Sequence, residues 1–565
     1  MHIADLIALV VYFLLIVGIG FWTASKVKNM ADFIMPRKFG KLMMVFFGFG
    51  TGTHSDQAVS VAAKSYTNGV SGIWYQWLWL FVSPFYWIIA PVMRRFRALT
   101  TADVFELRFG RSVSMLFAVV GLVQYSVNIG VMLKGSSAVI EASTGGLVQA
   151  DWAIPVMTVL FVGYGIAGGL HAAVITDLIQ GVLTVVFSFL LLPFILHAVG
   201  GLSGMRAQVP ADMLSLVAPG EIGAFYVAII ALNALIGIVA QPHTMANCAA
   251  GKTELDGQVG FMCGSLLKRV CTIAWTLTGV AAIAYFAQQQ VVDLKPDNVF
   301  GEVAYRFLPK IYPGLLGLFI AGLLASVMSS CDAFMISTSG LFTENIYKPL
   351  MPNKSEKHYL RAARLAALGV VVTGVVFAYA LESVVHGLEI FWKITPMMGI
   401  AFWLGLFWRR TTTAGAWVST LSAFAAWWLS TQPYFIGWVA GLPGADSLHF
   451  ISEKGGELTI YLPWQMIFYL VAGTVSGVVV SLCTKPIAAA RLDRFYSLVR
   501  TPVVEGEAVA APCTLPAGTV APEPRKIFNC RSLEIYVPAA NMIWGFLAGW
   551  AAVGLLIGVF VWLVR

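Results

Sequence analysis

Polar side chains that could bind a cation lie inside two apolar segments of the chain. The first segment has glycines at positions 48, 50 and 52, followed by the polar run Thr53-His-Ser-Asp-Gln57. Glycines weaken a helix, and a polar run at membrane depth needs partners. The second segment carries Ser326, Ser329 and Asp332, whose spacing of three residues places them on one face of a helix. Oxygen ligands suit a hard cation of the sodium type, so we expect a cation site between the two segments. Close packing of small residues would explain the serines but not Asp332.

The sequence shows no pattern typical of covalent chemistry. Its seven cysteines form neither a close pair nor a metal-ligand spacing, which argues against a disulfide framework or a zinc site. We find no nucleotide-binding, nucleic-acid-binding or catalytic motif. We therefore expect no enzyme, no organic cofactor and no nucleic-acid partner.

The composition defines the class of protein that must position these residues. Of 565 residues, 58% are hydrophobic and 11% are charged, against about 25% charged in an average soluble protein. This balance excludes a soluble enzyme, a fibrous protein and a disordered chain. Apolar runs approach the roughly 20 residues that span a bilayer, and they are apolar on all sides, which favours helices over a barrel. The sequence predicts an all-α polytopic membrane protein.

Apolar windows predict fourteen transmembrane helices. We expect them at about 3–25, 40–65, 72–93, 112–140, 150–168, 173–199, 223–246, 262–288, 313–342, 362–382, 385–408, 412–431, 462–484 and 541–564. The seventh contains Asn233, Gly237 and Pro242, and the second contains the three glycines, so both are expected to be interrupted. Breaks five helices apart indicate an inverted-repeat transporter with its site at the breaks, the alternative being kinks satisfied by neighbouring helices.

Basic residues predict the orientation of the chain in a cell membrane. Of 36 lysines and arginines, 27 fall in the connections after odd-numbered helices and seven on the opposite side. Basic residues accumulate on the cytoplasmic side, so both termini are expected outside. The connection at 485–540 carries prolines at 502, 512, 516, 522 and 524 among small and charged residues, and it is predicted to be a cytoplasmic linker with little fixed structure. The net charge of +8 then indicates contact with anionic headgroups.

Four motifs resemble the sodium:solute symporter family, which includes sodium/glucose cotransporters and proline, pantothenate and sialic acid permeases. They are Tyr164–Gln180 with its Thr-Asp-x-x-Gln box, Gln241-Pro-His243, the serine pair of helix 9 leading to Phe342–Tyr347, and Phe407–Arg410. The resemblance covers about residues 1–485, and 493–503 is similar to the tail of the sugar-transporter branch. It implies a five-plus-five inverted repeat of the LeuT type that works by alternating access. The expected division is 1–37 (first helix and connection), 38–410 (transport core, helices 2–11), 411–484 (helices 12–13), 485–540 (linker) and 541–565 (helix 14).

The resemblance also implies the ligands of the transported cations. The principal sodium site would use the main-chain carbonyls of Gly50, Thr53 and Ser326 and the hydroxyls of Ser329 and Ser330. The alignment of 55–57 with the Ser-Asp-Met of proline permeases is a second-ranked alternative. A possible second cation site would use Asp177, Ser329 and Asp332, with two carboxylates facing one site.

The solute is less well defined by the resemblance. Candidate pocket residues are His54, Gln57, Gln76, Lys134, Asn233 and Lys393. Gln57 matches a sugar-branch glutamine, but Gln76 replaces an acid of that branch, and Leu235-Ile236 and Leu388 replace its aromatic pair and its second glutamine. Sialic acid permeases carry a carboxylate-binding cation near Lys134, for which snorkelling or structural pairing is the alternative.

Two further candidate side chains have competing interpretations. Lys393 lies four residues from Glu389, and the two are expected to neutralise each other inside the bundle. His54 could titrate near neutral pH or remain a neutral hydrogen-bonding group.

The expected function is sodium-coupled symport of a small polar solute, either a sugar or a small organic acid. Two alternatives remain open: a proton-coupled transporter that uses His54, Asp56 and Asp332, and a membrane sensor of the same fold that signals through 485–540. The expected partners are the solute, sodium ions and the lipid bilayer, and the oligomeric state is not indicated.

Overall fold

The structure is a computed structural model of the chain. It describes residues 2–24, 35, 37–218, 222–291, 293–454, 456–507 and 511–565, without the side chains at 17, 19–24, 164–176 and 454. Lys26 and Lys28, which contributed to the predicted orientation, lie outside the described residues, as do the side chains of the motif from Tyr164 to Thr176. The described part is a helical bundle with one small β-hairpin, which agrees with the predicted helical class.

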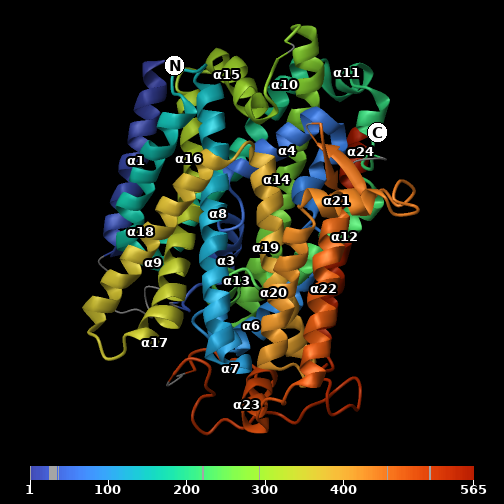
Figure 1. Cartoon of the computed structure of the whole chain (residues 1–565). Coiled ribbons are helices and arrows are strands. Elements are labelled where there is room, and N and C mark those ends of the chain that lie inside the picture. Colours follow the sequence, from blue (N-terminus) through green and yellow to red (C-terminus); the bar gives the residue numbers. More distant parts are fainter. Residues whose placement is uncertain are drawn as a thin grey trace.

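The long helices make up the body of the bundle (Figure 1). They are α1 (Ile3–Ala24), α3 (Lys41–Gly50), α4 (Ser55–Asn68), α6 (Ser83–Arg95), α8 (Arg111–Ser143), α9 (Ala150–Leu190), α12 (Ala224–Ile238), α14 (Glu254–Gln288), α16 (Leu315–Phe342), α18 (Glu356–Ala380), α19 (Val384–Phe407), α20 (Thr413–Leu429), α22 (Leu462–Cys483) and α24 (Ala540–Val564). Eight described helices are long and apolar enough to cross a bilayer, and four shorter helices or helix portions are also apolar.

Shorter elements connect these helices. They are η1 (Gly69–Ile73), α5 (Trp74–Trp77), α7 (Thr101–Phe109), α10 (Leu192–Ala198), α11 (Gly201–Gln208), η2 (Ala211–Leu214), α13 (Thr244–Ala249), η3 (Pro296–Asn298), α15 (Val299–Ile311), the π-helical η4 (Thr343–Tyr347), α17 (Lys348–Leu350), α21 (Pro433–Ala440), β1 (Ile451–Lys454), β2 (Glu457–Ile460) and α23 (Ala489–Arg500). The strands β1 and β2 pair in antiparallel register, with Ile451 opposite Ile460.

The largest difference from the predicted helices lies in α9. Separate helices were expected at 150–168 and 173–199, but α9 is continuous over Ala150–Leu190, and α10 follows it. The observed break falls at Leu191, before Pro193 at the start of α10. Proline removes a backbone donor and restricts the residue before it, so it ends a helix more effectively than the glycines near 168.

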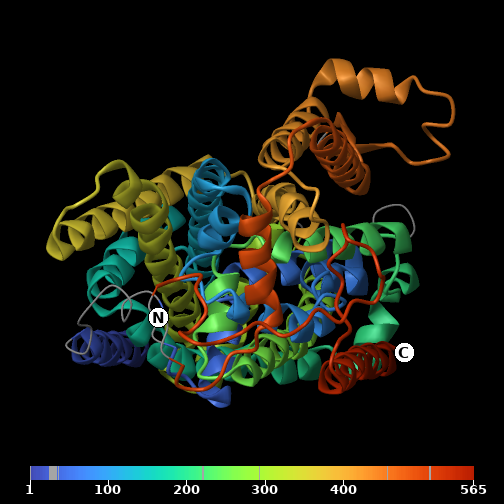
Figure 2. The same cartoon turned by 90° about the horizontal axis from the view of Figure 1, so that it is seen from below.

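Both described ends of the chain lie at one end of the bundle, and α7, α17 and α23 lie at the other (Figure 1). We call the end that carries α7, α17 and α23 the inner end. An even number of crossings would give this arrangement, and the assignment of the inner end to the cytoplasm stays a prediction. The elements α20, α21 and α22 project to one side of the bundle (Figure 2).

The segment at 485–540 has more structure than its composition predicted. It begins with α23, which buries one apolar face formed by Leu492, Phe495 and Tyr496. Its later part forms bridges between Trp408 and Leu533 and between Lys526 and Tyr536. The expectation of little fixed structure was wrong because it judged the segment alone, whereas the segment is ordered by contacts with the inner ends of the bundle helices.

Candidate functional site

The first predicted break is confirmed between α3 and α4. Helix α3 ends at Gly50 and α4 begins at Ser55, and His54 before α4 has an extended backbone with φ −136°. The hydroxyl of Thr51 donates to the carbonyl oxygen of Phe47 at 2.7 Å. The helix is therefore interrupted where the glycines are followed by polar residues, and the carbonyl oxygens of Gly50 and Gly52 at the break accept hydrogen bonds from side chains of other helices.

The second predicted break is confirmed between α12 and α13. Helix α12 ends at Ile238 and α13 begins at Thr244, with Pro242 between them. The hydroxyl of Thr244 donates to the carbonyl oxygen of Ile238 at 2.7 Å. The hydroxyl of Thr51 also lies 2.9 Å from the side-chain amide of Asn247 on α13. This contact joins the two interrupted helices, so the breaks predicted from separate parts of the sequence meet in space.

Oxygen atoms from the first break and from α16 converge at a buried point. The hydroxyl of Ser330 donates to the carbonyl oxygen of Gly50 at 2.9 Å and lies 3.2 Å from the carbonyl oxygen of Ser326. The hydroxyl of Ser329 donates to the carboxylate of Asp177 on α9. A Cβ atom at Gly50 would lie 3.1 Å from both the Ser329 oxygen and the Asp177 carboxyl carbon, so only glycine leaves this space open. Hydroxyl, carbonyl and carboxylate oxygens in such a cluster suit sodium.

The remaining predicted cation ligands lie close to this cluster in the chain. Thr53 lies in the same break, and its buried hydroxyl makes no hydrogen bond within the described part of the chain. The Ser326 hydroxyl donates to the carbonyl oxygen of Leu323 at 2.8 Å, so its own carbonyl is the group that faces Ser330. Asp332 is buried on α16. Its convergence with Asp177 on one cation stays a prediction.

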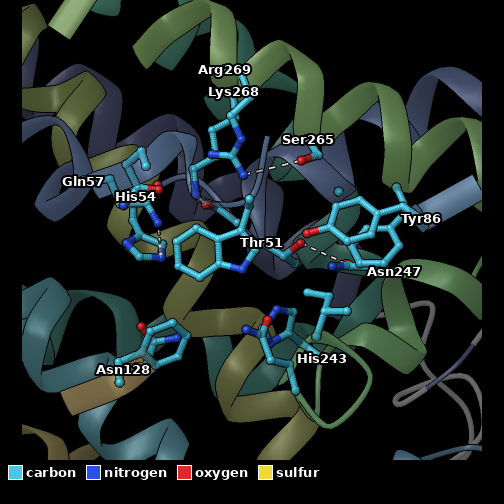
Figure 3. A pocket seen from close by; sticks show the side chains of 18 of the residues that line it. Thr51, His54, Gln57, Tyr86, Asn128, His243, Asn247, Ser265, Lys268 and Arg269 are labelled. Carbon is cyan, nitrogen blue, oxygen red and sulfur yellow. Dashed lines mark hydrogen bonds between the residues drawn. The ribbon is translucent and has the colours of Figure 1, made fainter. Parts of the chain in front are cut away.

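A cavity of about 70 Å³ adjoins both breaks (Figure 3). Its polar lining residues are Thr51, His54, Gln57, Gln76, Asn128, Gln241, His243, Asn247, Ser265, Lys268 and Arg269. Its aromatic lining residues are Trp79, Tyr86, Phe261, Phe334 and Phe391. A concave site of apolar walls with a few convergent polar groups is typical of small-molecule binding.

Two basic side chains of the cavity were missed by the sequence interpretation. Lys268 and Arg269 were counted among the residues of the cytoplasmic connection, but α14 begins at Glu254 and carries both into the bundle. The ammonium of Lys268 donates to the carbonyl oxygen of Gly52 in the first break. Both cations lie near the ring of Trp79, at 5.8 and 6.0 Å from its centroid. The count of 27 basic residues in cytoplasmic connections therefore included two that line the cavity.

Arg269 is held at the edge of the cavity by other parts of the bundle. Its carbonyl oxygen accepts a hydrogen bond from the Trp77 indole at 3.1 Å, and its Nη2 lies 3.5 Å from the hydroxyl of Ser265. Its Nε and Nη1 are buried and make no hydrogen bond to any described residue. Buried guanidinium donors without acceptors are costly, and an anion in the cavity would satisfy them.

The polar run at the start of α4 is internally connected. The ring nitrogen Nδ1 of His54 contacts the carboxylate of Asp56, and its Nε2 lies 3.2 Å from the Gln57 amide nitrogen. Ser55 is hydrogen-bonded to Ser136 of α8 at 2.7 Å. The His54 ring is therefore oriented by Asp56, while His54 and Gln57 both face the cavity.

Three predicted pocket residues do not line this cavity. Lys393 donates to Gln465 of α22 at 3.2 Å. Asn233 donates to the Trp392 carbonyl oxygen at 2.9 Å, and its amide oxygen accepts from Tyr469 at 2.5 Å. These two side chains are used in packing against α22. Lys134 lies six residues after Asn128, which lines the cavity, and six residues turn a helix through about 240°, so it faces elsewhere.

The expected neutralisation of Lys393 by Glu389 stays a prediction. In the structure, Lys393 donates to Gln465, and Glu389 accepts a hydrogen bond from the hydroxyl of Tyr75 at 3.0 Å.

A family model and several known proteins match this chain. The family model "Sodium:solute symporter family" matches residues 33–422. Among the similar proteins are a sodium/glucose cotransporter of Vibrio parahaemolyticus, 23% identical over 74% of this chain and 83% of its own length, and the osmoregulated proline transporter OpuE of Bacillus subtilis, 26% identical over 76% and 90%. A sodium/pantothenate symporter of Haemophilus influenzae is 22% identical over 76% and 91%.

Two solved structures share the helical transporter fold. A Na+-coupled sialic acid symporter in a substrate-bound outward-open state superposes with a TM-score of 0.66, at 15% identity over 86% of this chain and 98% of that chain. The nucleobase-cation-symport-1 family transporter Mhp1, in a closed conformation, gives 0.52, at 9% identity over 82% and 99%. At these identities the likeness concerns the fold alone.

Proposed function

The chain belongs to the sodium:solute symporter family, and from this membership we propose that it carries a small organic anion across the membrane together with sodium. The family consists of multi-pass membrane transporters, so the protein is a transporter and not an enzyme. We further propose the five-plus-five inverted repeat over 38–410, with 411–484 and 541–565 outside it, both termini outside the cell and alternating access to the cavity.

The oxygen cluster between the first break and α16 supports the sodium site. It unites carbonyl oxygens of Gly50 and Ser326 with the Ser330 hydroxyl, and all of these atoms are ligands that the family resemblance implies. The neighbouring carboxylate of Asp177 supplies a negative charge close to the same point. Sodium bound there would link α3 to α16, and its release would loosen that link.

The cations of the cavity carry the proposal that the solute is an anion. Lys268 and Arg269 both line the cavity, and none of its described lining residues is an aspartate or glutamate. Asp56, which lies between the cavity residues His54 and Gln57 in the chain, is engaged with His54. A carboxylate group would accept charge-assisted hydrogen bonds from either cation, which a neutral sugar cannot do as strongly. Proline, pantothenate and sialic acid, which appear in the names of the similar transporters, all carry a carboxylate.

The test is a screen of solutes against the purified protein in the presence of sodium or potassium. We expect small carboxylates to raise the melting temperature only with sodium, since a ligand at 100 times its Kd stabilises the folded state by about 2.7 kcal/mol. The solute found in this way should then accumulate in proteoliposomes under a sodium gradient. Stabilisation by neutral sugars alone would contradict the anion assignment, and binding without flux would favour the sensor interpretation.

A second candidate function is proton-coupled transport, which the buried contact between His54 and Asp56 favours. A proton on this pair would alter the charge beside the cavity. Uptake driven by a pH gradient in sodium-free proteoliposomes would support it. Uptake that requires sodium at every pH would contradict it.

A conservative substitution tests the sodium site. Ser330→Ala removes one oxygen ligand while keeping the residue small. We expect the sodium concentration for half-maximal uptake to rise about tenfold, because losing one ligand or hydrogen bond of about 1.4 kcal/mol has that effect. Ser339→Ala is the matched control on the same helix, since that hydroxyl donates to the Ala363 carbonyl oxygen at 3.0 Å, away from the cluster. Equal sodium dependence in the two variants would assign the serine stripe to packing.

A further inference from the structure

The segment after α22 crosses the inner end of the bundle, which Figure 2 shows from below. We call residues 489–540 the strap. The strap begins with α23, whose buried face includes Tyr496, and it continues to the start of α24. Its described part contacts the inner end of the bundle in two places. One set of contacts is with α6 and α14, and the other is with the turn between α19 and α20.

One set of contacts holds the inner ends of α6 and α14. The guanidinium of Arg97, which follows α6, forms a two-pronged ion pair with Glu507, each bond being 2.8 Å. The side chain of Arg97 is 1% exposed and that of Glu507 is 9% exposed. The backbone N–H of Val503 donates to Glu254, the first residue of α14, at 2.8 Å. Glu254 also pairs with Arg95 of α6. The strap is thus bound to the end of α6 by a buried ion pair and to α14 by a backbone hydrogen bond.

The other set of contacts holds the turn between α19 and α20. Arg409 in this turn pairs with Glu534 at 2.7 Å and with Asp493 at 2.5 Å. Backbone bonds add to these pairs, since the N–H of Arg409 donates to Ser532 and the N–H of Glu534 donates to Phe407. Burial raises the pKa of Glu534, but hydrogen bonds from Tyr536, Arg409 and Lys526 outweigh it and hold the pKa below its ordinary value. Glu534 is therefore a charged partner for Arg409.

We propose that the strap is an inner latch, which ties α6 and α14 to the α19–α20 turn and must release before the cavity opens to the inner side. This inference rests on the proposed alternating-access function, in which the two interrupted helices and their neighbours move against the rest of the fold. Helix α6 and helix α14 both line the cavity, through Tyr86 and Lys268. A tie between their inner ends and a different part of the fold opposes that movement.

Cysteines provide two reporters of the latch. Cys513 in the strap is 7% exposed, and its backbone N–H donates to the carbonyl oxygen of Arg97 at 3.4 Å. Burial raises the pKa of its thiol, so it should react slowly while the latch is closed. A cysteine at position 250 reports the pathway above the latch, because buried Ala250, the residue after α13, follows the cavity residues His243 and Asn247 at helical spacing.

The background for labelling replaces the two exposed cysteines by Cys483→Ser and Cys530→Ser. Cys530 must be removed because hydrogen bonds from the Ser532 side chain and backbone lower the pKa of its thiol, which makes it reactive. Labelling by a polar maleimide is then measured in two versions of the full-length protein in nanodiscs. One version keeps the native Cys513, and the other combines Cys513→Ser with Ala250→Cys. Neither measurement needs the solute or uptake.

The decisive variant is Glu507→Gln, with Glu505→Gln as its control. Glu505 is exposed, two residues away, and makes no hydrogen bond within the described part of the strap. We expect Glu507→Gln to speed labelling at both positions at least about tenfold, because it leaves the buried Arg97 without a charged partner. Arg409→Gln, which removes the other anchor, should act in the same direction.

The outcomes separate the latch from the proposed function. Faster labelling of Cys513 alone would show local loosening and overturn the latch, as would unchanged labelling at both positions or an equal effect of Glu505→Gln. Sodium is expected to slow labelling of the cysteine at position 250 in the protein that keeps Glu507. If sodium has no effect while Glu507→Gln still opens both positions, the latch stands and sodium coupling fails.

Discussion

Solute binding is expected to weaken strongly when Lys268 is replaced by glutamine. The substitution removes the positive charge beside Gly52 in the first break and beside Trp79 in the cavity wall. A charge-assisted hydrogen bond contributes about 1.5–3 kcal/mol, so the apparent Kd for an anionic solute should rise roughly 10- to 150-fold. The measurement is sodium-dependent binding by isothermal titration, together with initial uptake rates in proteoliposomes.

Two matched variants make the Lys268 result specific. Lys252→Gln removes the same charge from an exposed position just before α14, and it should leave binding unchanged. Lys268→Arg keeps the charge and should retain more binding than Lys268→Gln, although the planar guanidinium group of arginine differs in shape from an ammonium group. A glutamine variant that binds the solute as tightly as the unmodified protein would remove the basis for an anionic solute.

Asp177→Asn is expected to abolish sodium-driven accumulation. The carboxylate accepts a hydrogen bond from Ser329 and lies beside Gly50, where the oxygen cluster forms. The amide has nearly the same volume but no charge, so sodium loses an attraction of about 1.5–3 kcal/mol, or roughly 10- to 150-fold in sodium affinity. Uptake measured against sodium concentration gives this shift directly. Asp212→Asn, at an exposed position in η2, is the control.

The number of charges moved per solute molecule tests whether Asp332 binds a second cation together with Asp177. If the two carboxylates bind a second cation, combined current and radiolabel measurements should show an additional charge per cycle, and Asp332→Ser should change its pH dependence. Asp177→Asn should be the more damaging of the two. A stoichiometry of one sodium that neither substitution nor pH alters would leave Asp332 as a structural residue.

Local sequence signals predicted the interrupted helices and the oxygen cluster. The glycines at 48, 50 and 52 and the proline at 242 act on the backbone of their own segment, so their effect does not depend on the rest of the fold. The serine spacing on α16 likewise follows from helix geometry alone. Even so, the glycines have a second role that the sequence does not show, because a Cβ atom at Gly48 would lie 2.8 Å from the Gly260 carbonyl oxygen of α14.

Lys268 was assigned to the cytoplasmic connection although it falls within the helix predicted at 262–288. That helix was expected to begin at 262 rather than at Glu254, so Lys268 lay close to its predicted end. A local signal for the true start was present, since Thr253 and Asp256 form a capping box. Reading that box would have placed Lys268 about 21 Å along the helix, inside the bundle.

The sequence by itself determined the helical membrane class, the two breaks and the types of oxygen atom available to a cation, since each depends on composition or on residues close together in the chain. Only the tertiary structure decided which faces of the helices contact one another. Lys134, Asn233 and Lys393 lie on helices that are apolar on most sides, so their direction depends on the neighbouring helices. The same holds for the ion pair of Arg97 and Glu507, which are 410 residues apart. Such contacts form only when the folded bundle brings distant charges together in a buried place, where their pairing outweighs the conformational freedom of the free segment.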